Sequence, residues 1–191
     1  MSEKVKYPRE KALAVAHDLV EKLKPSCVTG FIEIAGSLRR GKEMVGDIEI
    51  VFVPKTIQEP DGLFNTKPVS LAEKLIESWL AVGFITKRLA VTGKISSWGA
   101  NNKHAIHVES GIPVDLFAEP DIQDWPRSLV IRTGSKDFNV LLMSSAPRNG
   151  YNAHAYGEAL HKIPSGERVI MKTEREFIEA CGVKFRVPSE R

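Results

Sequence analysis

The sequence predicts an α+β fold, in which a mixed β-sheet with flanking helices is followed by a small, mainly helical C-terminal lobe. Two helical patterns stand among short alternating runs that are typical of strands, and these predict the first part. A change after Pro120, from β-rich runs to helical patterns, predicts the second. We therefore expect a domain at residues 1–120 and another at residues 121–191.

The first half of the chain alternates helical and extended patterns. Apolar residues recur every three or four positions over residues 8–23, which predicts an amphipathic helix, and Pro8 suits its start. "FIEIAGS" and "DIEIVFVP" alternate apolar and polar residues, which predicts two strands with a short connection. Residues 55–68 hold two prolines and a glycine, so we expect a loop. Ser70 and Glu73 form a capping box for a second helix.

Three further β-rich runs complete the predicted sheet. They are "FITKRLAVTG", "KHAIHVES" and "GIPVDLFAEP", all within residues 84–120. Beyond them, residues 121–150 are mostly helical and residues 150–166 are typical of a short hairpin. Thr173 and Glu176 form another capping box, which predicts a last helix.

Composition limits the class of protein. The 191-residue chain is 42% apolar, enough for a core in one domain or two small lobes, and its net charge of +3 permits a polyanionic partner without requiring one. No window has the ~18 apolar residues of a membrane span, and the start lacks the apolar run of a secretory signal. We therefore expect a cytoplasmic protein with no membrane partner. Cys27 and Cys181 form no C-x-x-C unit and are expected to be reduced, structural thiols.

Two acids lie at the start of the second predicted strand. Successive side chains of a strand point to opposite faces, so Asp47 and Glu49 share one face while Ile48 and Ile50 share the other. Carboxylates this close repel each other unless they share a proton or a cation lies between them. Mg²⁺, which prefers oxygen ligands, is the natural occupant. Taken alone, however, such a pair is more often an exposed face with salt bridges.

A third acid, Asp115, lies inside the apolar run "GIPVDLFAEP". If its strand lies beside the strand with Asp47 and Glu49, the three acids could hold two metal ions. Two ions so held clamp the attacking and leaving oxygens in phosphoryl or nucleotidyl transfer.

The residues upstream could bind phosphate. Gly36 and Ser37 end a strand, where backbone N–H groups and a hydroxyl can face an anion, and Arg39 and Arg40 bring positive charge to the same turn. Gly46 would let a phosphate approach the backbone closely. A Gly-Ser step taken alone is usually only a turn, so the prediction depends on the joint pattern.

These residues together resemble family X of the DNA polymerases, the DNA polymerase beta-like group. "GSLRRGKEMVGDIEI" is similar to the family signature G-S-x-R-R-G…G-D-h-[DE], and "VDLF" resembles the strand with its third metal-binding acid. "RTGSKDFNVLL" resembles the T-G-S-x-x-F-N segment, and "TEREFIEACGVKFRVPSER" resembles the C-terminal helix and basic tail. The resemblance implies a nucleotidyltransferase palm at residues 1–120 and a thumb-like domain that binds nucleotide and DNA at residues 121–191.

On the matching positions, the resemblance also implies site roles. Asp47 and Glu49 would bind two Mg²⁺ ions, and Asp115 would complete the catalytic ion's site and accept the proton of the primer 3′-hydroxyl or activate it electrostatically. The nucleotide-binding residues would be Gly36, Ser37, Arg40 and Gly46 at the phosphates, Gly134 at the sugar and Asn139 at the minor-groove edge of the base.

The chain departs from the family at several positions. The family usually has a second Asp where this chain has Glu49, which is one methylene longer. Ile131 and Arg132 stand where many members carry a Tyr-Phe pair against the sugar, so selection between deoxy- and ribonucleotides stays open. Pro113 replaces a basic residue near the third acid.

The resemblance begins near residue 28, which leaves no room for a lyase domain, so we expect a reduced, monomeric polymerase. Without that domain the chain would grip DNA through its own basic side chains, and binding should weaken steeply with salt. These side chains are Lys87, Arg88, Lys94, Lys103, Arg127, Arg148 and Lys162.

The leading hypothesis is a template-directed DNA polymerase that adds nucleotides to a primer 3′-hydroxyl by a two-metal mechanism and fills short gaps in DNA repair. Its partners would be gapped or primed DNA and nucleoside triphosphates. The first alternative is a nucleotidyltransferase that acts on an RNA end, a small molecule or a protein. The second is a non-catalytic nucleic-acid-binding module, although acids on an apolar strand are costly without a metal.

Overall fold

The computed structural model describes residues 5–62, 64–158 and 160–191, so the first four residues of the predicted N-terminal domain lie outside the described part. The larger lobe contains a five-stranded mixed sheet in the order β2-β4-β9-β8-β7. In this sheet β4 and β9 are parallel, and the other neighbours are antiparallel. The strands are β2 (Cys27–Ile34), β4 (Ile48–Pro54), β7 (Ile85–Lys87), β8 (Asn102–His107) and β9 (Pro113–Ala118).

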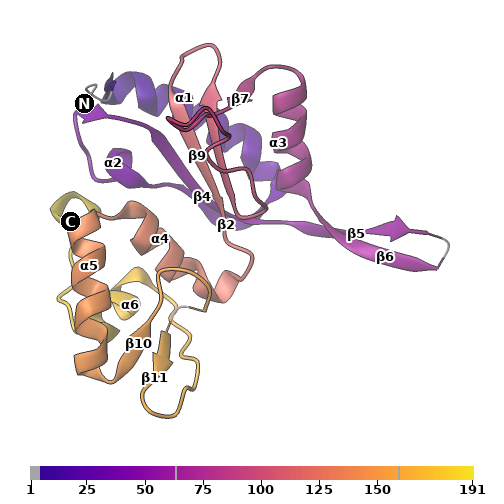
Figure 1. Cartoon of the computed structure of the whole chain (residues 1–191). Coiled ribbons are helices and arrows are strands. Elements are labelled where there is room, and N and C mark those ends of the chain that lie inside the picture. The colour runs from indigo at the N-terminus through magenta and orange to yellow at the C-terminus, as the bar shows by residue number, and fades with distance from the viewer. Residues whose placement is uncertain (1–4, 63, 159) are drawn as a thin grey trace.

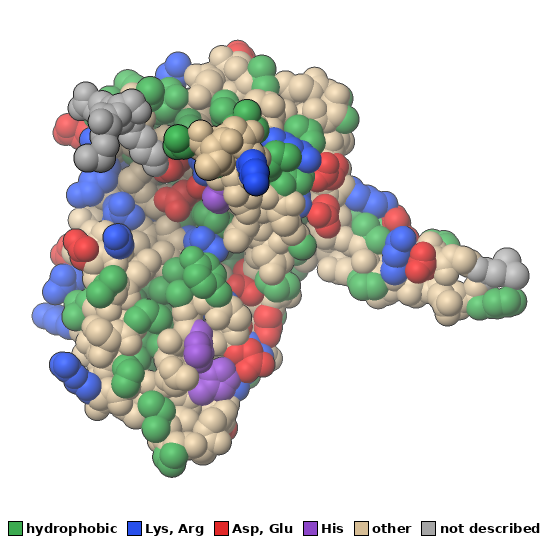
Figure 2. Space-filling view, viewed as in Figure 1, with side chains coloured by type: hydrophobic (Ala, Val, Ile, Leu, Met, Phe, Trp, Pro, Cys, Tyr) green, Lys and Arg blue, Asp and Glu red, His purple; other side chains and the backbone are tan. Residues whose placement is uncertain are grey.

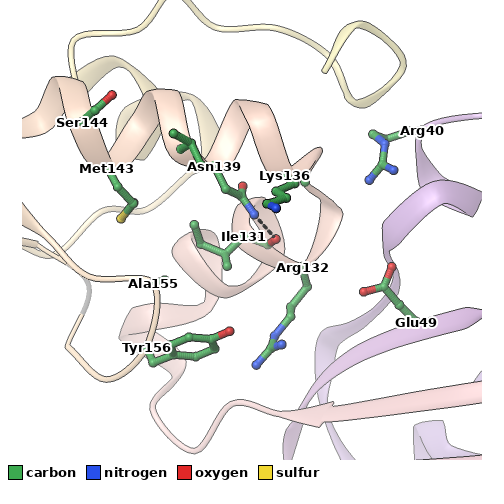
Figure 3. Close-up of a pocket in the computed structure, with 12 residues that line it drawn as sticks. Arg40, Glu49, Ile131, Arg132, Lys136, Asn139, Met143, Ser144, Ala155 and Tyr156 are labelled. Carbon is green, nitrogen blue, oxygen red and sulfur yellow. Dashed lines mark hydrogen bonds between the residues drawn. The ribbon is translucent and has the colours of Figure 1, made fainter. Parts of the chain in front are cut away.

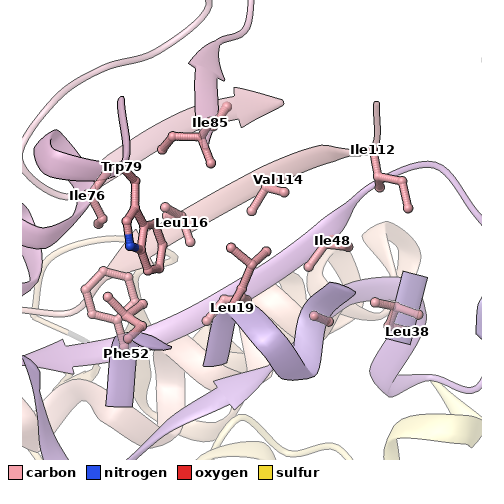
Figure 4. Packing of buried hydrophobic residues seen from close by; sticks show 14 of the residues in the cluster. Leu19, Leu38, Ile48, Phe52, Ile76, Trp79, Ile85, Ile112, Val114 and Leu116 are labelled. Atoms are coloured by element: carbon pink, nitrogen blue, oxygen red, sulfur yellow. The ribbon is translucent and has the colours of Figure 1, made fainter. Parts of the chain in front are cut away.

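Two helices, α1 (Arg9–Leu23) and α3 (Leu71–Ala81), pack against one face of the sheet (Figure 1). The Ser70 hydroxyl accepts a hydrogen bond from the backbone N–H of Glu73 at 3.1 Å, which confirms the predicted cap of α3. Buried side chains of both helices meet those of β4 and β9 in the main core (Figure 4). Among them are Leu19, Ile48, Phe52, Trp79, Val114 and Leu116.

The opposite face of the same strands faces the C-terminal lobe. Because side chains alternate along a strand, Glu49 and Asp115 point away from the main core. Further along these strands Val51 and Phe117 form a small second cluster, and Trp125 at the start of α4 packs against it. The two lobes therefore meet beside the predicted acids.

The C-terminal lobe has its own core, which confirms the expected α+β fold with a small, mainly helical second lobe. Phe138, Leu142 and Phe177 are among its buried side chains. The hairpin expected within residues 150–166 is present, whereas the boundary near residue 120 stays a prediction. The elements are α4 (Trp125–Thr133), α5 (Lys136–Ser145), β10 (Tyr151–Ala153), β11 (Leu160–Lys162) and α6 (Glu174–Ala180).

Smaller elements support the segment that precedes β4. The predicted connection after β2 is the one-turn helix α2 (Gly36–Arg39). The N-terminal strand β1 (Tyr7–Pro8) pairs with β3 (Met44–Val45), which ends two residues before Asp47. Short 3₁₀ turns occur at Lys24–Ser26, Ile122–Asp124, Ala146–Asn149 and Pro188–Glu190.

The prediction of a loop at residues 55–68 is wrong. β5 (Thr56–Asp61) and β6 (Asn65–Ser70) pair in a two-stranded arm that projects from the larger lobe (Figure 1). Pro60 and Pro68 lie within its strands. Each strand of a two-stranded ribbon has an unpaired edge, where a proline without an N–H is tolerated.

Cys27 and Cys181 are buried free thiols, as expected. Burial raises the pKa of each to about 12, so both stay protonated at neutral pH. Within the described ranges, no helix is long and apolar enough to cross a membrane.

Candidate active site

The structure brings the three predicted acids together. β4 and β9 are parallel neighbours, and Glu49 lies directly opposite Asp115 in their register. Asp47 immediately precedes Ile48, the first residue of β4. The back of this strand is anchored by Ile48 and Ile50, both fully buried in the main core. The alternation seen in the sequence therefore separates an anchoring face from an acidic face.

Glu49 is an uncompensated carboxylate. Burial, and then the negative charges of Asp47 and Asp115, raise its pKa to about 7, against the weaker opposing influence of Arg40 and Arg132. Glu49 thus gives up its proton much less readily than an ordinary glutamate.

Asp115 has two cationic neighbours. Its side chain is largely buried, and its Oδ1 atom lies 2.8 Å from Nη2 of Arg88. Its Oδ2 atom lies 3.9 Å from Nε2 of His104, the residue opposite it on β8. Burial still raises the pKa of Asp115, although Arg88 and His104 oppose the change. His104 in turn shares a 2.9 Å hydrogen bond between its Nδ1 and the hydroxyl of Ser96.

The three carboxylates fit Mg²⁺ in their chemistry, because they are hard oxygen donors and a cation would offset both the burial and the repulsion that raise the pKa of Glu49. They are neighbours rather than a finished ligand set. In the part of the chain that is described, no three histidine, cysteine or acidic side chains are arranged to hold an ion as they stand. Asp115 contacts Arg88 instead.

Gly36, at the start of α2, lies against Glu49. Its φ is +62°, and a Cβ atom there would lie 1.7 Å from Oε2 of Glu49. A side chain is therefore excluded by both the backbone conformation and the carboxylate. Of the other residues predicted at the phosphates, Ser37 lies half-buried on α2 and Gly46 directly precedes Asp47.

Arg40 links the predicted phosphate site to the C-terminal lobe. Its Nη1 donates a hydrogen bond to the backbone carbonyl of Thr133, at the end of α4. Gly134 follows with a φ of +67°, and a Cβ there would lie 3.1 Å from the same guanidinium. The residues predicted for phosphate and sugar thus come from different lobes and meet at this point.

A cavity of about 720 Å³ lies between the lobes, beside Glu49 (Figure 3). Arg40, Gly134 and Asn139 are among its lining residues. The Asn139 amide donates to the backbone carbonyl of Ile131 at 2.8 Å, and its buried Oδ1 has no hydrogen-bond partner among the described residues. Acidic side chains are visible in the hollow between the lobes (Figure 2). The cavity gathers four of the nine predicted site residues, with Asp47 and Asp115 close to Glu49.

Two further residues line the cavity: Arg132, which the resemblance places near the sugar, and Tyr156, which no signal in the sequence places there. Arg132 stacks on Phe117, with its guanidinium carbon 3.7 Å from the ring centroid, and donates to Oδ1 of Asn102 at 3.3 Å. Tyr156, from the segment between β10 and β11, lies 5.1 Å from the same carbon. The guanidinium is therefore held between two rings in the wall of the cavity.

Arg39 does not serve the predicted phosphate turn. It forms two hydrogen bonds to Glu174 of α6, at 2.5 and 3.0 Å, and one to the hydroxyl of Thr133 at 2.9 Å. The buried side chain of Arg191 also donates to Glu174, at 2.9 Å. Burial would raise the pKa of Glu174, but hydrogen bonds and charges from Arg39 and Arg191 outweigh it and lower the pKa. This charged cluster holds the lobes together.

The predicted basic DNA-binding surface is partly wrong. Lys103 is 4% exposed and pairs with Glu73, and Arg127 is 4% exposed and pairs with Glu119. Arg88 is engaged with Asp115. Arg127 and Arg88 thus partner buried carboxylates, which require a counter-charge, whereas Lys103 is itself buried and pairs with the half-exposed Glu73. Of the remaining predicted cations, Lys94 and Arg148 are exposed, and other lysines and arginines follow the left edge of the view in Figure 2.

Family models match most of the chain. The model described as DNA polymerase beta palm matches residues 6–108, and the model described as DNA polymerase beta thumb matches residues 128–191. Asp115 lies between the two matched ranges.

Two curated proteins are similar over nearly the whole chain. "DNA polymerase/3'-5' exonuclease PolX" of Bacillus subtilis (strain 168) is 26% identical over 188 residues, which cover 97% of this chain and 28% of the relative. "DNA polymerase lambda" of Rattus norvegicus is 25% identical over 205 residues, which cover 97% of this chain and 33% of the relative. The chain thus spans about a third of the length of these relatives.

Proposed function

Since the chain belongs to the DNA polymerase beta family, family X of the DNA polymerases, we propose that it is a template-directed DNA polymerase that uses Mg²⁺. It adds nucleotides to a primer 3′-hydroxyl by a two-metal mechanism. We further propose that it fills short gaps during DNA repair, acts as a monomer and works in the cytoplasm.

One observation carries this proposal: Glu49 and Asp115 are directly opposed on parallel strands, beside a cavity that both lobes line. The raised pKa of Glu49 supports a cation site, because bound cations would remove the repulsion among the acids. A cavity of about 720 Å³ has a size typical of small-molecule and cofactor sites.

In the proposed reaction, the primer 3′-oxygen attacks the α-phosphorus of the nucleotide, pyrophosphate leaves, and Asp115 accepts the hydroxyl proton. Asp47 and Glu49 would hold both Mg²⁺ ions, and Asp115 would complete the site of the catalytic ion. When bound, the ions lower the pKa of the attacking hydroxyl and offset charge on the triphosphate.

The protein residues position the nucleotide. The Arg40 guanidinium donates a hydrogen bond to the Thr133 carbonyl and would give it up to donate to the triphosphate instead. The backbone of Gly36, the hydroxyl of Ser37 and Gly46 would lie beside the same phosphates. Gly134 would admit the sugar to the backbone. Asn139 would reach the base with the amide that now contacts the Ile131 carbonyl.

A primer-extension assay with Mg²⁺ tests the proposal. A gapped duplex and a singly primed template are each supplied with one deoxy- or ribonucleotide at a time, and an RNA primer is run in parallel. We expect addition of the nucleotide complementary to the template, with stronger extension on the gapped duplex. Absence of any incorporation would contradict the polymerase proposal, and template-independent or RNA-primed addition would favour a different nucleotidyltransferase.

A further inference from the structure

Arg88 is held in place on both sides of its backbone. It directly follows β7, its N–H donates to the carbonyl of His104 at 2.9 Å, and its carbonyl accepts from the N–H of Ser96 at 2.9 Å. The side chain is 22% exposed and reaches across β8 to β9, where its Nη2 lies 2.8 Å from Oδ1 of Asp115. The backbone of Arg88 is thus fixed between two neighbouring segments, and its guanidinium forms an ion pair with Asp115.

The contact involves the acid to which the proposed reaction assigns the primer proton. Asp115 lies between Glu49 on β4 and His104 on β8 in the strand register. Without a cation at Oδ1, repulsion from Glu49 and Asp47 would turn the carboxylate away from them. Arg88 offsets part of this repulsion through an ion pair whose geometry is not that of a hydrogen bond, since Oδ1 of Asp115 has no hydrogen-bond partner among the described residues.

The strand of Asp115 itself offers no such cation. Residues two apart on a strand share a face, so Pro113 is the neighbour of Asp115 on its own face of β9. The family resemblance implies a basic residue near this acid, where the chain has Pro113, which carries no charge. Arg88 thus brings a positive charge to the same carboxylate from a different strand.

We propose that Arg88 is a positioning residue for Asp115, and that it supplies from just after β7 the positive charge that the strand of Asp115 does not carry. The proposal rests on the proposed polymerase function for its kinetic part. It predicts opposite effects on metal binding and on catalysis. Removal of a positive charge at 2.8 Å strengthens the attraction of the acids for a divalent cation, while loss of the fixed orientation slows the proton transfer.

The experiment compares Arg88→Ala with the double variant Arg88→Ala/Pro113→Arg and with Arg88→Lys. Mn²⁺ binding to the metal-free protein is measured by electron paramagnetic resonance without DNA or nucleotide. The kcat and the KM for nucleotide are measured on a gapped duplex. Arg175→Ala is the matched control, because it removes an arginine from an exposed ion pair with Glu179.

We expect Arg88→Ala to bind Mn²⁺ about 3-fold more tightly and to lose about 10-fold or more in kcat, with KM for nucleotide changed less than about 3-fold. Pro113→Arg should reverse both changes, Arg88→Lys should fall between, and Arg175→Ala should change neither quantity. In the Asp115→Asn background, Arg88→Ala should raise Mn²⁺ affinity less than it does in the wild-type background, because the carboxylate that Arg88 contacts is gone and only its longer-range repulsion of the ion remains. A merely structural role of Arg88 would predict the same change in both backgrounds.

Several results would overturn the proposal. One is that Arg88→Ala changes neither Mn²⁺ affinity nor kcat by more than about 2-fold. Another is that both quantities fall together and Pro113→Arg restores neither. A third is that Arg88→Ala weakens only the binding of the gapped duplex, which would make Arg88 a DNA contact. If the wild-type protein incorporates no nucleotide, the polymerase proposal fails separately, and the Mn²⁺ measurements alone decide the role of Arg88.

Discussion

Two glutamates at the junction of the lobes have pKa values that are shifted in opposite directions. Glu49 faces two other acids, and its pKa rises to about 7. Glu174 accepts hydrogen bonds from Arg39 and Arg191, and its pKa falls below the ordinary value. Both carboxylates are substantially removed from water, so the difference comes from their partners.

This difference separates Glu174, a carboxylate with structural partners, from Glu49, for which we propose a role in metal binding. The Glu174 cluster supplies both charges from the protein and therefore joins the lobes without any ligand. At Glu49 the cations Arg40 and Arg132 only partly offset burial and the charges of Asp47 and Asp115, which leaves this carboxylate with a deficit of positive charge. A deficit of this kind is stable only if a cation binds or a proton is retained, which is the property expected of a metal site.

The largest expected effect that tests this comparison is at the acidic cluster. Asp115→Asn removes a proposed ligand and proton acceptor, so we expect incorporation to fall about 10³-fold or more while nucleotide binding is largely retained. Single-turnover extension and nucleotide titration measure the two quantities. Asp61→Asn, in an exposed ion pair of the arm, is the control. Activity that survived in Asp115→Asn would show that the metal assignment is wrong.

The second effect concerns the charged cluster between the lobes. Glu174→Gln leaves Arg39 and Arg191 without their shared anion, and we expect a loss of about 3 kcal/mol in the free energy of unfolding at pH 7. Because the folded pKa of Glu174 is lowered, this stabilisation is complete above the ordinary carboxyl pKa and is lost as the pH falls through the folded value. Urea unfolding at pH 7 and at pH 3 measures it. Equal stability of variant and wild type at pH 7 would contradict the proposed joining role.

The third expected effect is a gain in stability rather than a loss. The folded pKa of Glu49, about 7, exceeds its ordinary value of 4.5, so the metal-free wild type binds an extra proton and loses stability as the pH rises between them. Glu49→Gln should therefore be more stable than wild type by about 1 kcal/mol at pH 8 in EDTA. The difference should disappear near pH 4.5. Thermal unfolding across this range checks it, and a variant that is less stable at pH 8 would refute the electrostatic account.

The smallest effect is at an exposed pair. Glu179 and Arg175 are more than half exposed and lie 3.1 Å apart on α6, the helix that begins with Glu174. Glu179→Gln should change the free energy of unfolding by less than about 0.5 kcal/mol. A loss as large as that of Glu174→Gln would show that burial and shared hydrogen bonds are not what distinguishes Glu174.

The sequence was sufficient for the acids but not for their surroundings. Asp47 and Glu49 could be predicted to share a face because side-chain alternation is local. That Asp115 joins them depended on two strands being neighbours, which the family resemblance implied and which the parallel pairing of β4 and β9 shows. Arg88 and Tyr156 could not be predicted beside them. Their positions depend on long-range pairing and on the closure of one lobe against the other, which no short pattern encodes.

The roles of the basic residues were predicted least well. A basic side chain in an otherwise unassigned segment suggests a solvated surface, yet Lys103 and Arg127 are buried against Glu73 and Glu119. The same ambiguity applies to Arg39, which was assigned to phosphate and contacts Glu174. Whether a cation serves a ligand or a buried acid depends on distant residues, and so it follows only from the tertiary structure.

The β5–β6 arm is a separable module. None of its described residues belongs to the core clusters, and Lys55 and Leu71, which bracket it, already share a 3.0 Å backbone hydrogen bond. The tip of the ribbon can therefore be shortened or extended to carry a fluorophore, provided that Ser70, the cap of α3, and Glu59, which pairs with Lys74 of α3, are kept. The chain thus offers an attachment point for single-molecule measurements of the proposed DNA binding, at a place away from the acids, the cavity and the joint between the lobes.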